Sequence, residues 1–202
     1  MGTKTARETR KMKKRVAVLA LQGDFAEHET ALQKSGAETF QIRQKADLEQ
    51  PFDALVIPGG ESTVIGKLLR ELDLFQPLQE RIRNGLPVLA TCAGLILLAE
   101  RIENDSAEHF RTLNVTVRRN AYGRQLGSFY TEGKFAEMEA LPMTFIRAPS
   151  IESVGEGVTV LSEFNGKATA VQQGKQVALA YHPELLDDCR IYQWFVSILD
   201  RK

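Results

Sequence analysis

A cysteine at the end of an apolar run is the first candidate for chemistry in this chain. In PVLATCAGLILLAE (residues 87–100), a buried strand is expected to run directly into a buried helix through Cys92 and Ala93. A side chain at such a junction stands on a sharp turn at the carboxyl edge of a sheet, where the crowded backbone needs small neighbours such as Ala93 and Gly94. The start of the helix directs N–H groups at the sulfur and favours the thiolate. From this stretch alone, a small apolar core residue explains Cys92 equally well.

A histidine and a glutamate follow a second apolar run. His182 and Glu184 come directly after QVALAY (residues 176–181), so they also fall at the carboxyl end of an expected strand. Residues two apart in extended backbone point the same way, and Pro183 biases His182 toward that conformation. A carboxylate beside an imidazole fixes its tautomer and stabilises the imidazolium during proton transfer. A surface histidine near a solvated glutamate is the plainer interpretation, but a cysteine on the same sheet edge favours a catalytic pair.

Paired glycines lie between a third apolar run and a helical segment, in PGGES (residues 58–62). Without a Cβ, Gly59 and Gly60 let backbone N–H groups approach a ligand. The N–H of Gly60 and that of Ala93 are the candidates for an oxyanion hole. A phosphate-binding Walker A loop is excluded, because five residues separate Gly60 from Gly66 and Lys67 is followed by leucine.

The pattern of apolar residues predicts an α/β protein. Short Val- and Ala-rich runs without alternation, at residues 15–21, 54–57, 87–91 and 176–181, are typical of strands buried on both faces of a parallel sheet. Amphipathic segments at residues 24–35, 62–72, 77–84 and 188–199 predict helices. From residue 113 to residue 174, β-branched runs alternate with turns, and FNGK (residues 164–167) predicts a hairpin. We expect three layers, in a flavodoxin-like open and mostly parallel sheet with helices on both faces and an antiparallel extension in the second half.

Composition limits the class of protein. The chain has 202 residues, 43% hydrophobic and 26% charged, with 26 basic and 26 acidic side chains, which is ordinary for a soluble domain. The balanced charge gives no reason to expect nucleic acid or a membrane surface as a partner, and no apolar run approaches the roughly 18 residues of a membrane span. Seven basic residues among the first 15 suggest that residues 1–14 are a disordered basic extension, and residues 15–202 a single domain. The apolar run at residues 16–21 is too short for a secretory signal, and no A-x-A site follows it.

The remaining candidate ligands carry less information. Two cysteines in a chain of this length fit a reducing, cytoplasmic setting better than a disulfide framework. His28 and His109 are interpreted as ordinary surface or packing residues, and Cys189 as a structural thiol. No spacing of His, Cys and Asp suggests a metal site, and we expect no metal and no cofactor.

Several longer motifs give a resemblance to a known family. They are VAVLALQGDFAEH (residues 16–28), VIPGGEST (56–63), ATCAGLILLA (90–99), LNVTVRRNAYGRQ (113–125), FIRAP (145–149) and HPEL (182–185). In this order the chain resembles class I, triad-type glutamine amidotransferases, and more narrowly the glutaminase subunits of pyridoxal 5′-phosphate synthases. The basic leader is the one departure from the family pattern, and it leaves the triad residues untouched.

The resemblance implies a role for each candidate residue. Cys92 would attack the side-chain carboxamide of L-glutamine, His182 would transfer protons, and Glu184 would orient His182. The N–H groups of Gly60 and Ala93 would hold the oxyanion. By the same resemblance, the glutamine site would be lined by Gly59, Gly60, Glu61, Arg119, Ile146 and Arg147. Without the family, the two arginines would be taken as solvated surface charges.

The resemblance also implies a partner. Similar proteins dock on a (β/α)₈-barrel synthase subunit and pass ammonia into it for pyridoxal 5′-phosphate synthesis, and we expect residues 21–25 and 59–63 to lie near that docking face. Two other classes remain open at this point. One is a hydrolase that uses the same three residues on another bond, such as a peptidase or γ-glutamyl hydrolase. The other is a noncatalytic flavodoxin-like binding module.

Overall fold

The central feature of the fold is a seven-stranded sheet with the order β10-β11-β12-β4-β3-β1-β2. The computed structural model describes residues 13–103, 105–107, 109–119 and 128–200. Its five parallel strands are β1 (Arg15–Leu19), β2 (Glu38–Ile42), β3 (Ala54–Ile57), β4 (Val88–Thr91) and β12 (Gln176–Leu179). Strands β1, β3 and β4 are almost completely buried, which agrees with their uninterrupted apolar sequences. The order β2-β1-β3-β4-β12 is that of a flavodoxin-like sheet, so the predicted fold class is confirmed.

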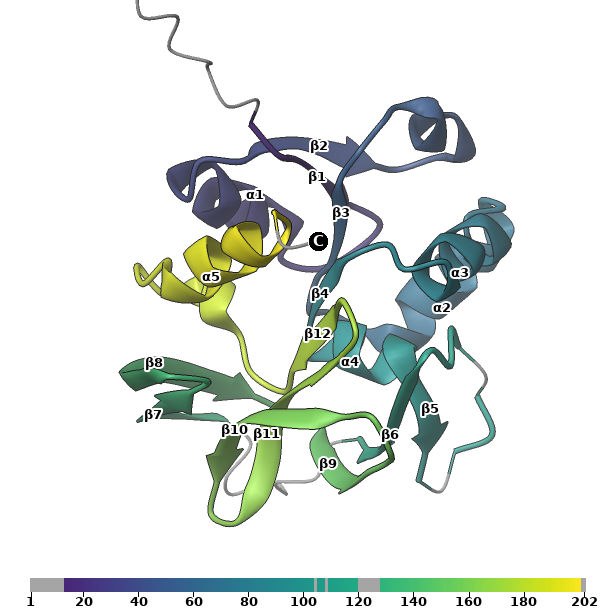
Figure 1. The fold of residues 1–202 in the computed structure, drawn as a ribbon. Coiled ribbons are helices and arrows are strands. Elements are labelled where there is room, and N and C mark those ends of the chain that lie inside the picture. Colours follow the sequence, from purple (N-terminus) through teal and green to yellow (C-terminus); the bar gives the residue numbers. More distant parts are fainter. Residues whose placement is uncertain (1–12, 104, 108, 120–127, 201–202) are drawn as a thin grey trace, which may run out of the picture.

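Helices cover both faces of this sheet, as Figure 1 shows. Helices α1 (Phe25–Lys34) and α5 (Arg190–Ile198) lie together on one face. Helices α2 (Ser62–Glu71), α3 (Phe75–Arg83) and the short α4 (Ala93–Leu98) lie on the other. The predicted helix at residues 77–84 begins two residues earlier, because Pro77 in the first turn needs no intrahelical N–H partner and does not have to start the helix.

The second half adds the predicted antiparallel strands. Strands β10 (Thr159–Phe164) and β11 (Lys167–Gln173) extend the central sheet as a hairpin, with Asn165 and Gly166 both at positive φ in its turn. Strands β5 (Ala99–Ile102), β6 (Leu113–Arg118) and β9 (Ser150–Val154) form a separate three-stranded sheet, in which β6 pairs antiparallel with β9 as predicted but parallel with β5. Strands β7 (Ser128–Phe135) and β8 (Met138–Ile146) pair as a long hairpin. Short 3₁₀ turns lie at η1 (Lys45–Glu49) and η2 (Pro183–Leu185).

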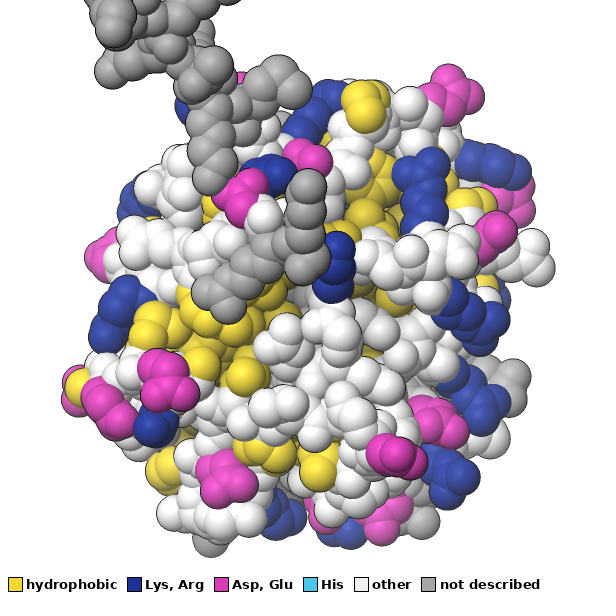
Figure 2. Space-filling model, viewed as in Figure 1, with side chains coloured by type: hydrophobic (Ala, Val, Ile, Leu, Met, Phe, Trp, Pro, Cys, Tyr) yellow, Lys and Arg dark blue, Asp and Glu magenta, His cyan; other side chains and the backbone are white. Residues whose placement is uncertain are grey.

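The surface carries charges of both signs. Figure 2 shows basic and acidic side chains interspersed over the visible face, as expected for a chain with equal numbers of each. Among the described residues, no helix is long and apolar enough to cross a membrane. Residues 1–12 of the predicted basic extension, and residues 120–125 of the RRNAYGRQ motif, lie outside the described residues.

Candidate active site

Cys92 lies on the strand-to-helix junction that its sequence predicts. It joins β4 to α4 with φ 47° and ψ −98°, a combination that a non-glycine residue rarely adopts. Its N–H donates to the carbonyl oxygen of Leu179 on β12 at 2.8 Å, which ties the turn to the neighbouring strand. A Cβ on Gly94 would overlap the carbonyl oxygen of Ile57, so the helix packs on the sheet only with glycine there. Strain of this kind is typical of functional positions, and the side chain stands at the carboxyl edge of the sheet.

His182 and Glu184 meet, but not through extended backbone. Glu184 lies in the 3₁₀ turn η2 and His182 precedes that turn, so the predicted extended conformation is wrong for residues 183–185. The tight turn still brings Nδ1 of His182 to 2.6 Å from Oε1 of Glu184. The backbone N–H of His182 donates to the carbonyl oxygen of Thr144 on β8 at 2.8 Å. The β7–β8 hairpin therefore fixes the backbone position of His182.

Electrostatics favours a charged His182. Burial alone would lower its pKa, but hydrogen bonds with Cys92 and Glu184, together with the Glu184 charge, raise the pKa of His182 to about 10. Since Glu184 holds Nδ1, the other ring nitrogen is left for the sulfur. Burial opposes ionisation of Glu184, yet the neighbouring His28 and His182 keep its pKa below the usual value. A protonated imidazole at His182 thus lies between the sulfur of Cys92 and the carboxylate of Glu184.

A cavity of about 370 Å³ opens beside the sulfur, within the usual size range of small-molecule sites. Its walls include Cys92 and His182 together with most of the residues predicted to bind glutamine, namely Gly60, Glu61, Arg119, Ile146 and Arg147. Gly59 is not part of the cavity wall. It lies against Cys92 and His182 instead, because a Cβ there would overlap the ring of His182 and lie 3.5 Å from Cβ of Cys92.

The two predicted oxyanion donors come from two different segments, the start of α4 and the loop after β3. Ala93 is the first residue of α4, where N–H groups have no intrahelical acceptor. Gly60 has φ 149° and lies on the cavity wall. Its positive φ would strain any other residue, and a Cβ on Gly60 would also overlap the end of the Gln22 side chain. Their assignment as an oxyanion hole remains a prediction.

Sequence reasoning missed further residues at the cavity: Gln22, Asp24, Ser62 and Ile96. Oε1 of Gln22 accepts the N–H of Glu61 at 2.6 Å, so the loop after β1 holds the glycine loop. Asp24 Oδ2 lies 3.6 Å from Nδ1 of His182, and partial burial together with the charge of Glu184 raises the pKa of Asp24. Gln22 and Asp24 both belong to the motif LQGD (residues 21–24), which could have identified them from the sequence.

Asp24, His182 and Glu184 also place possible metal-ligand atoms within 4.8 Å of one another. The 2.6 Å hydrogen bond between Nδ1 of His182 and Oε1 of Glu184 already uses one atom from each of two members. The cluster is therefore better explained by proton transfer than by metal binding.

His109 supports the predicted substrate-binding Arg119. Nε2 of this buried histidine lies 3.3 Å from Nη2 of Arg119, whose Nη1 contacts Asp105 at 3.0 Å and Thr63 Oγ1 at 3.1 Å. Burial, followed by the positive charges of Arg119 and Arg70, lowers the pKa of His109 to about 4. A neutral imidazole can accept the guanidinium N–H, so His109 is more than a packing residue.

We expect His109→Leu to raise KM for glutamine roughly tenfold with little change in kcat, because about 1.4 kcal/mol of guanidinium positioning is lost before the reaction begins. His109→Gln keeps an acceptor oxygen and should stay within about threefold of the original KM. Initial rates of glutamate release against glutamine concentration measure both values. An unchanged KM in the leucine variant would remove His109 from the binding site.

Comparisons with known proteins agree with this geometry. The model of the SNO glutamine amidotransferase family matches residues 18–201. The pyridoxal 5′-phosphate synthase subunit PdxT of Desulfitobacterium hafniense (strain Y51) is 59% identical over 189 residues, covering 93% of this chain and 95% of that protein. The subunit of the same name from Streptococcus pneumoniae (strain ATCC 700669 / Spain 23F-1) is 47% identical over 191 residues, covering 93% and 99%.

A solved structure described as a glutamine amidotransferase superposes with a TM-score of 0.86 at 41% identity, covering 91% of this chain and 98% of that chain. A structure of PurLQS from Thermotoga maritima reaches a TM-score of 0.70 at 14% identity, which shows the shared fold alone. Family match, relatives and solved structure agree over almost the whole chain: it belongs to the SNO glutamine amidotransferase family.

Proposed function

We propose that this protein hydrolyses L-glutamine to L-glutamate and ammonia, and supplies the ammonia to a partner synthase that makes pyridoxal 5′-phosphate. The observation that carries the proposal is that Cys92 and His182 lie on the wall of one cavity, while Glu184 holds Nδ1 of His182 through a 2.6 Å hydrogen bond. Relatives at 47–59% identity are named as subunits of that synthase.

The first half of the reaction forms a thioester. The sulfur of Cys92 attacks the carboxamide carbon of glutamine, and the carbonyl oxygen becomes an oxyanion held by the N–H groups of Gly60 and Ala93. The carbon–nitrogen bond then breaks, and His182 gives its proton to the departing nitrogen, which leaves as ammonia. Glu184 keeps the ring in place and stabilises its positive charge through the 2.6 Å hydrogen bond.

The second half returns the enzyme to its starting state. His182, now neutral, takes a proton from a water molecule that attacks the γ-glutamyl thioester. The carbon–sulfur bond breaks, glutamate forms, and the thiolate and imidazolium are restored. The same two side chains serve both halves, so no further acid or base is needed.

The charges around the cavity suit an amino acid. Glutamine is a zwitterion, so its carboxylate needs cationic donors and its ammonium group needs acceptors. The wall offers Arg119 and Arg147 for the first purpose, and Glu61 and Asp24 for the second. Arg147 has φ 41°, a strained backbone at the cavity edge that is typical of a ligand-binding position.

The partner would dock over the loops that line the cavity. A Cβ on Gly23 would overlap the carbonyl oxygen of Gly59, so the loop after β1 and the glycine loop press backbone against backbone. A docked subunit that displaced either loop would therefore also displace Gly59, which lies beside Cys92 and His182. This contact supports the proposal that the synthase subunit orders residues 21–25 and 59–63.

The test is glutamate release by the purified chain, with and without its cognate synthase subunit. We expect release from glutamine, stimulation by the partner, and incorporation of the nitrogen of amide-labelled glutamine into pyridoxal 5′-phosphate. A γ-glutamyl peptide and an ordinary peptide serve as competing substrates. Faster turnover of either peptide than of glutamine would overturn the proposal in favour of another hydrolase.

A further inference from the structure

A third histidine lies behind the catalytic pair, with no exposed surface. His28 belongs to α1, and its ring bridges three other elements. Nε2 lies 3.1 Å from Oγ1 of Thr91, the last residue of β4 before Cys92, and 3.6 Å from Oε1 of Glu184. Nδ1 lies 2.9 Å from the hydroxyl of Tyr192 on α5, which is also fully buried. One side chain thus contacts the strand that carries the nucleophile and faces the carboxylate that orients the base.

The surroundings decide which nitrogen of His28 carries the proton. Burial lowers the pKa of His28, so the ring is neutral and has one N–H. Burial likewise raises the pKa of Tyr192 well above its usual value, so the phenol keeps its proton and can donate it to Nδ1. The N–H is then on Nε2, directed at Thr91 Oγ1 and toward Glu184 Oε1. The opposite tautomer would turn a lone pair toward a carboxylate.

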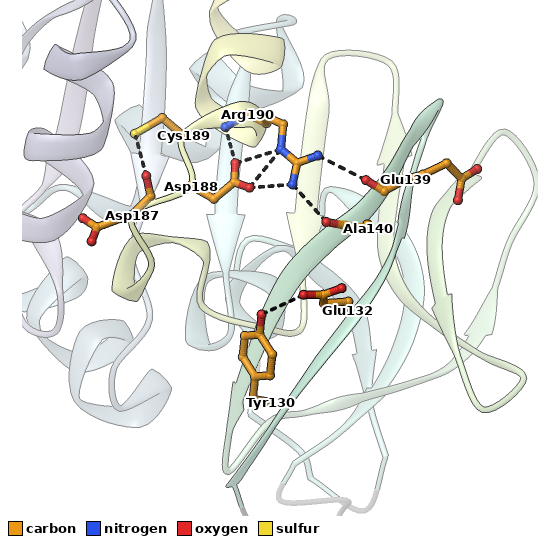
Figure 3. A network of polar contacts seen from close by, with 8 residues as sticks. All are labelled: Tyr130, Glu132, Glu139, Ala140, Asp187, Asp188, Cys189 and Arg190. Carbon is orange, nitrogen blue, oxygen red and sulfur yellow. Dashed lines mark hydrogen bonds and ion pairs between the residues drawn. The ribbon is translucent and has the colours of Figure 1, made fainter.

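The helix that brings Tyr192 is fixed at its start. The guanidinium of Arg190, the first residue of α5, pairs with Asp188 at 2.6 Å and donates to the carbonyl oxygens of Glu139 and Ala140 on β8 at 3.1 and 3.0 Å. Figure 3 shows this clasp between the start of α5 and the β7–β8 hairpin. Tyr192 follows two residues later, so its hydroxyl is held at a defined place behind His28.

We infer that His28 is a positioning residue of the glutaminase: Tyr192 sets its tautomer, and its Nε2–H donates to Thr91 at the end of β4 and faces the Glu184 carboxylate, which keeps both in the arrangement that lets His182 act on Cys92. This inference rests on the proposed function and extends its triad by two buried side chains. The resulting polar chain runs from Tyr192 through His28 and Glu184 to His182 and the sulfur. Each donor in it faces an acceptor.

A positioning role of His28 should change the dependence of kcat on pH. The titratable groups that face His28 are Glu184, His182, Asp24, Glu27 and Tyr192. Loss of the Nε2–H removes a donor near the Glu184 carboxylate, which raises the pKa of that carboxyl group. The acidic limb of the kcat profile should therefore move to higher pH in His28→Leu. Damage confined to packing would lower the rate without moving the limb.

The decisive experiment is a double-mutant cycle between His28→Leu and Glu184→Gln, with the cognate synthase present. We expect His28→Leu alone to lower kcat about 10–100-fold with little change in KM, and His28→Gln, which restores an N–H donor, to recover part of the loss. In the Glu184→Gln background, His28→Leu should cost less than about threefold, because the group through which it acts is already gone. Equal losses in both backgrounds would overturn the inference.

Two tyrosine variants distinguish loss of the Tyr192 hydroxyl from a general folding defect. Tyr192→Phe keeps the ring and removes only the hydroxyl, and we expect kcat to fall about fivefold. Tyr130→Phe removes an exposed hydroxyl that contacts Glu132 at 3.3 Å on β7, and should leave kcat unchanged. Equal kcat values for Tyr192→Phe, Tyr130→Phe and the unmodified protein would refute the tautomer argument.

Alkylation of Cys92 by iodoacetamide separates this inference from the proposed function, because it needs neither glutamine nor the partner. We expect alkylation near neutral pH to slow in His28→Leu and in Glu184→Gln, with no further slowing in the double variant. This result without any glutamate release would end the proposed function and keep the positioning role. Glutamate release with unaltered alkylation in His28→Leu would end the positioning role alone.

Discussion

Replacing Cys92 by alanine is expected to abolish glutamate release, with a loss in kcat on the order of 10⁴-fold or more. The variant removes the one sulfur among the described residues of the cavity wall, while the turn keeps its backbone anchor on Leu179. The remaining wall can still bind glutamine, so partner binding and thermal unfolding should change little. Glutamate release, and mass spectrometry of the acyl-enzyme after rapid quenching, measure the effect.

The second cysteine is the matched control for this prediction. Cys189 lies before α5, half-buried, with its sulfur 4.0 Å from the carbonyl oxygen of Asp187. Cys189→Ala should therefore keep the full rate and the acyl-enzyme signal. Turnover at the unmodified rate by Cys92→Ala, or loss of turnover in Cys189→Ala, would rule out the covalent mechanism through Cys92.

The fold was predictable wherever the chain specifies its structure locally. Strands β1, β3, β4 and β12 are uninterrupted apolar runs, and Asn165-Gly166 supplies the positive φ angles of the hairpin turn. Strand β2 was missed because only one of its residues, Ile42, is fully buried and its sequence ETFQI shows no clear pattern. Its place at the sheet edge depends on pairing with β1, which local propensity cannot reveal.

The site residues that could be predicted are likewise those that lie within short local motifs. Cys92, Gly94 and the HPEL turn were recognisable because each lies within a short motif at a strand end. His28 and His109 were taken for surface or packing residues, because no local motif shows what their rings contact. Thr91 and Tyr192 lie 63 and 164 positions from His28. Only the folded chain brings such groups together.

Replacing Glu184 by glutamine is expected to lower kcat by about 10³–10⁴-fold while leaving KM for glutamine within a small factor. Glutamine keeps the shape of the side chain but removes the negative charge that stabilises the imidazolium of His182 across the 2.6 Å hydrogen bond. Its amide can also present an N–H to Nδ1 and impose the wrong tautomer. Steady-state glutamate release measures the loss. Glu71→Gln, on an exposed acid paired with Lys67 at 3.6 Å on α2, is the control and should change neither constant.

The pH dependence of Glu184→Gln gives the same prediction a second, independent measurement. The pKa of His182 is raised to about 10 in the folded protein, from about 6.5 in the unfolded chain. A raised folded pKa contributes stability that is fully present below pH 6.5 and is lost as the pH rises through 10. Without the carboxylate, the pKa of His182 falls, so this loss of stability and the alkaline limb of the kcat profile should both move to lower pH. Urea unfolding between pH 6 and 10 and the kcat profile test this shift. Profiles identical to those of the unmodified protein would show that Glu184 does not hold the charge of His182.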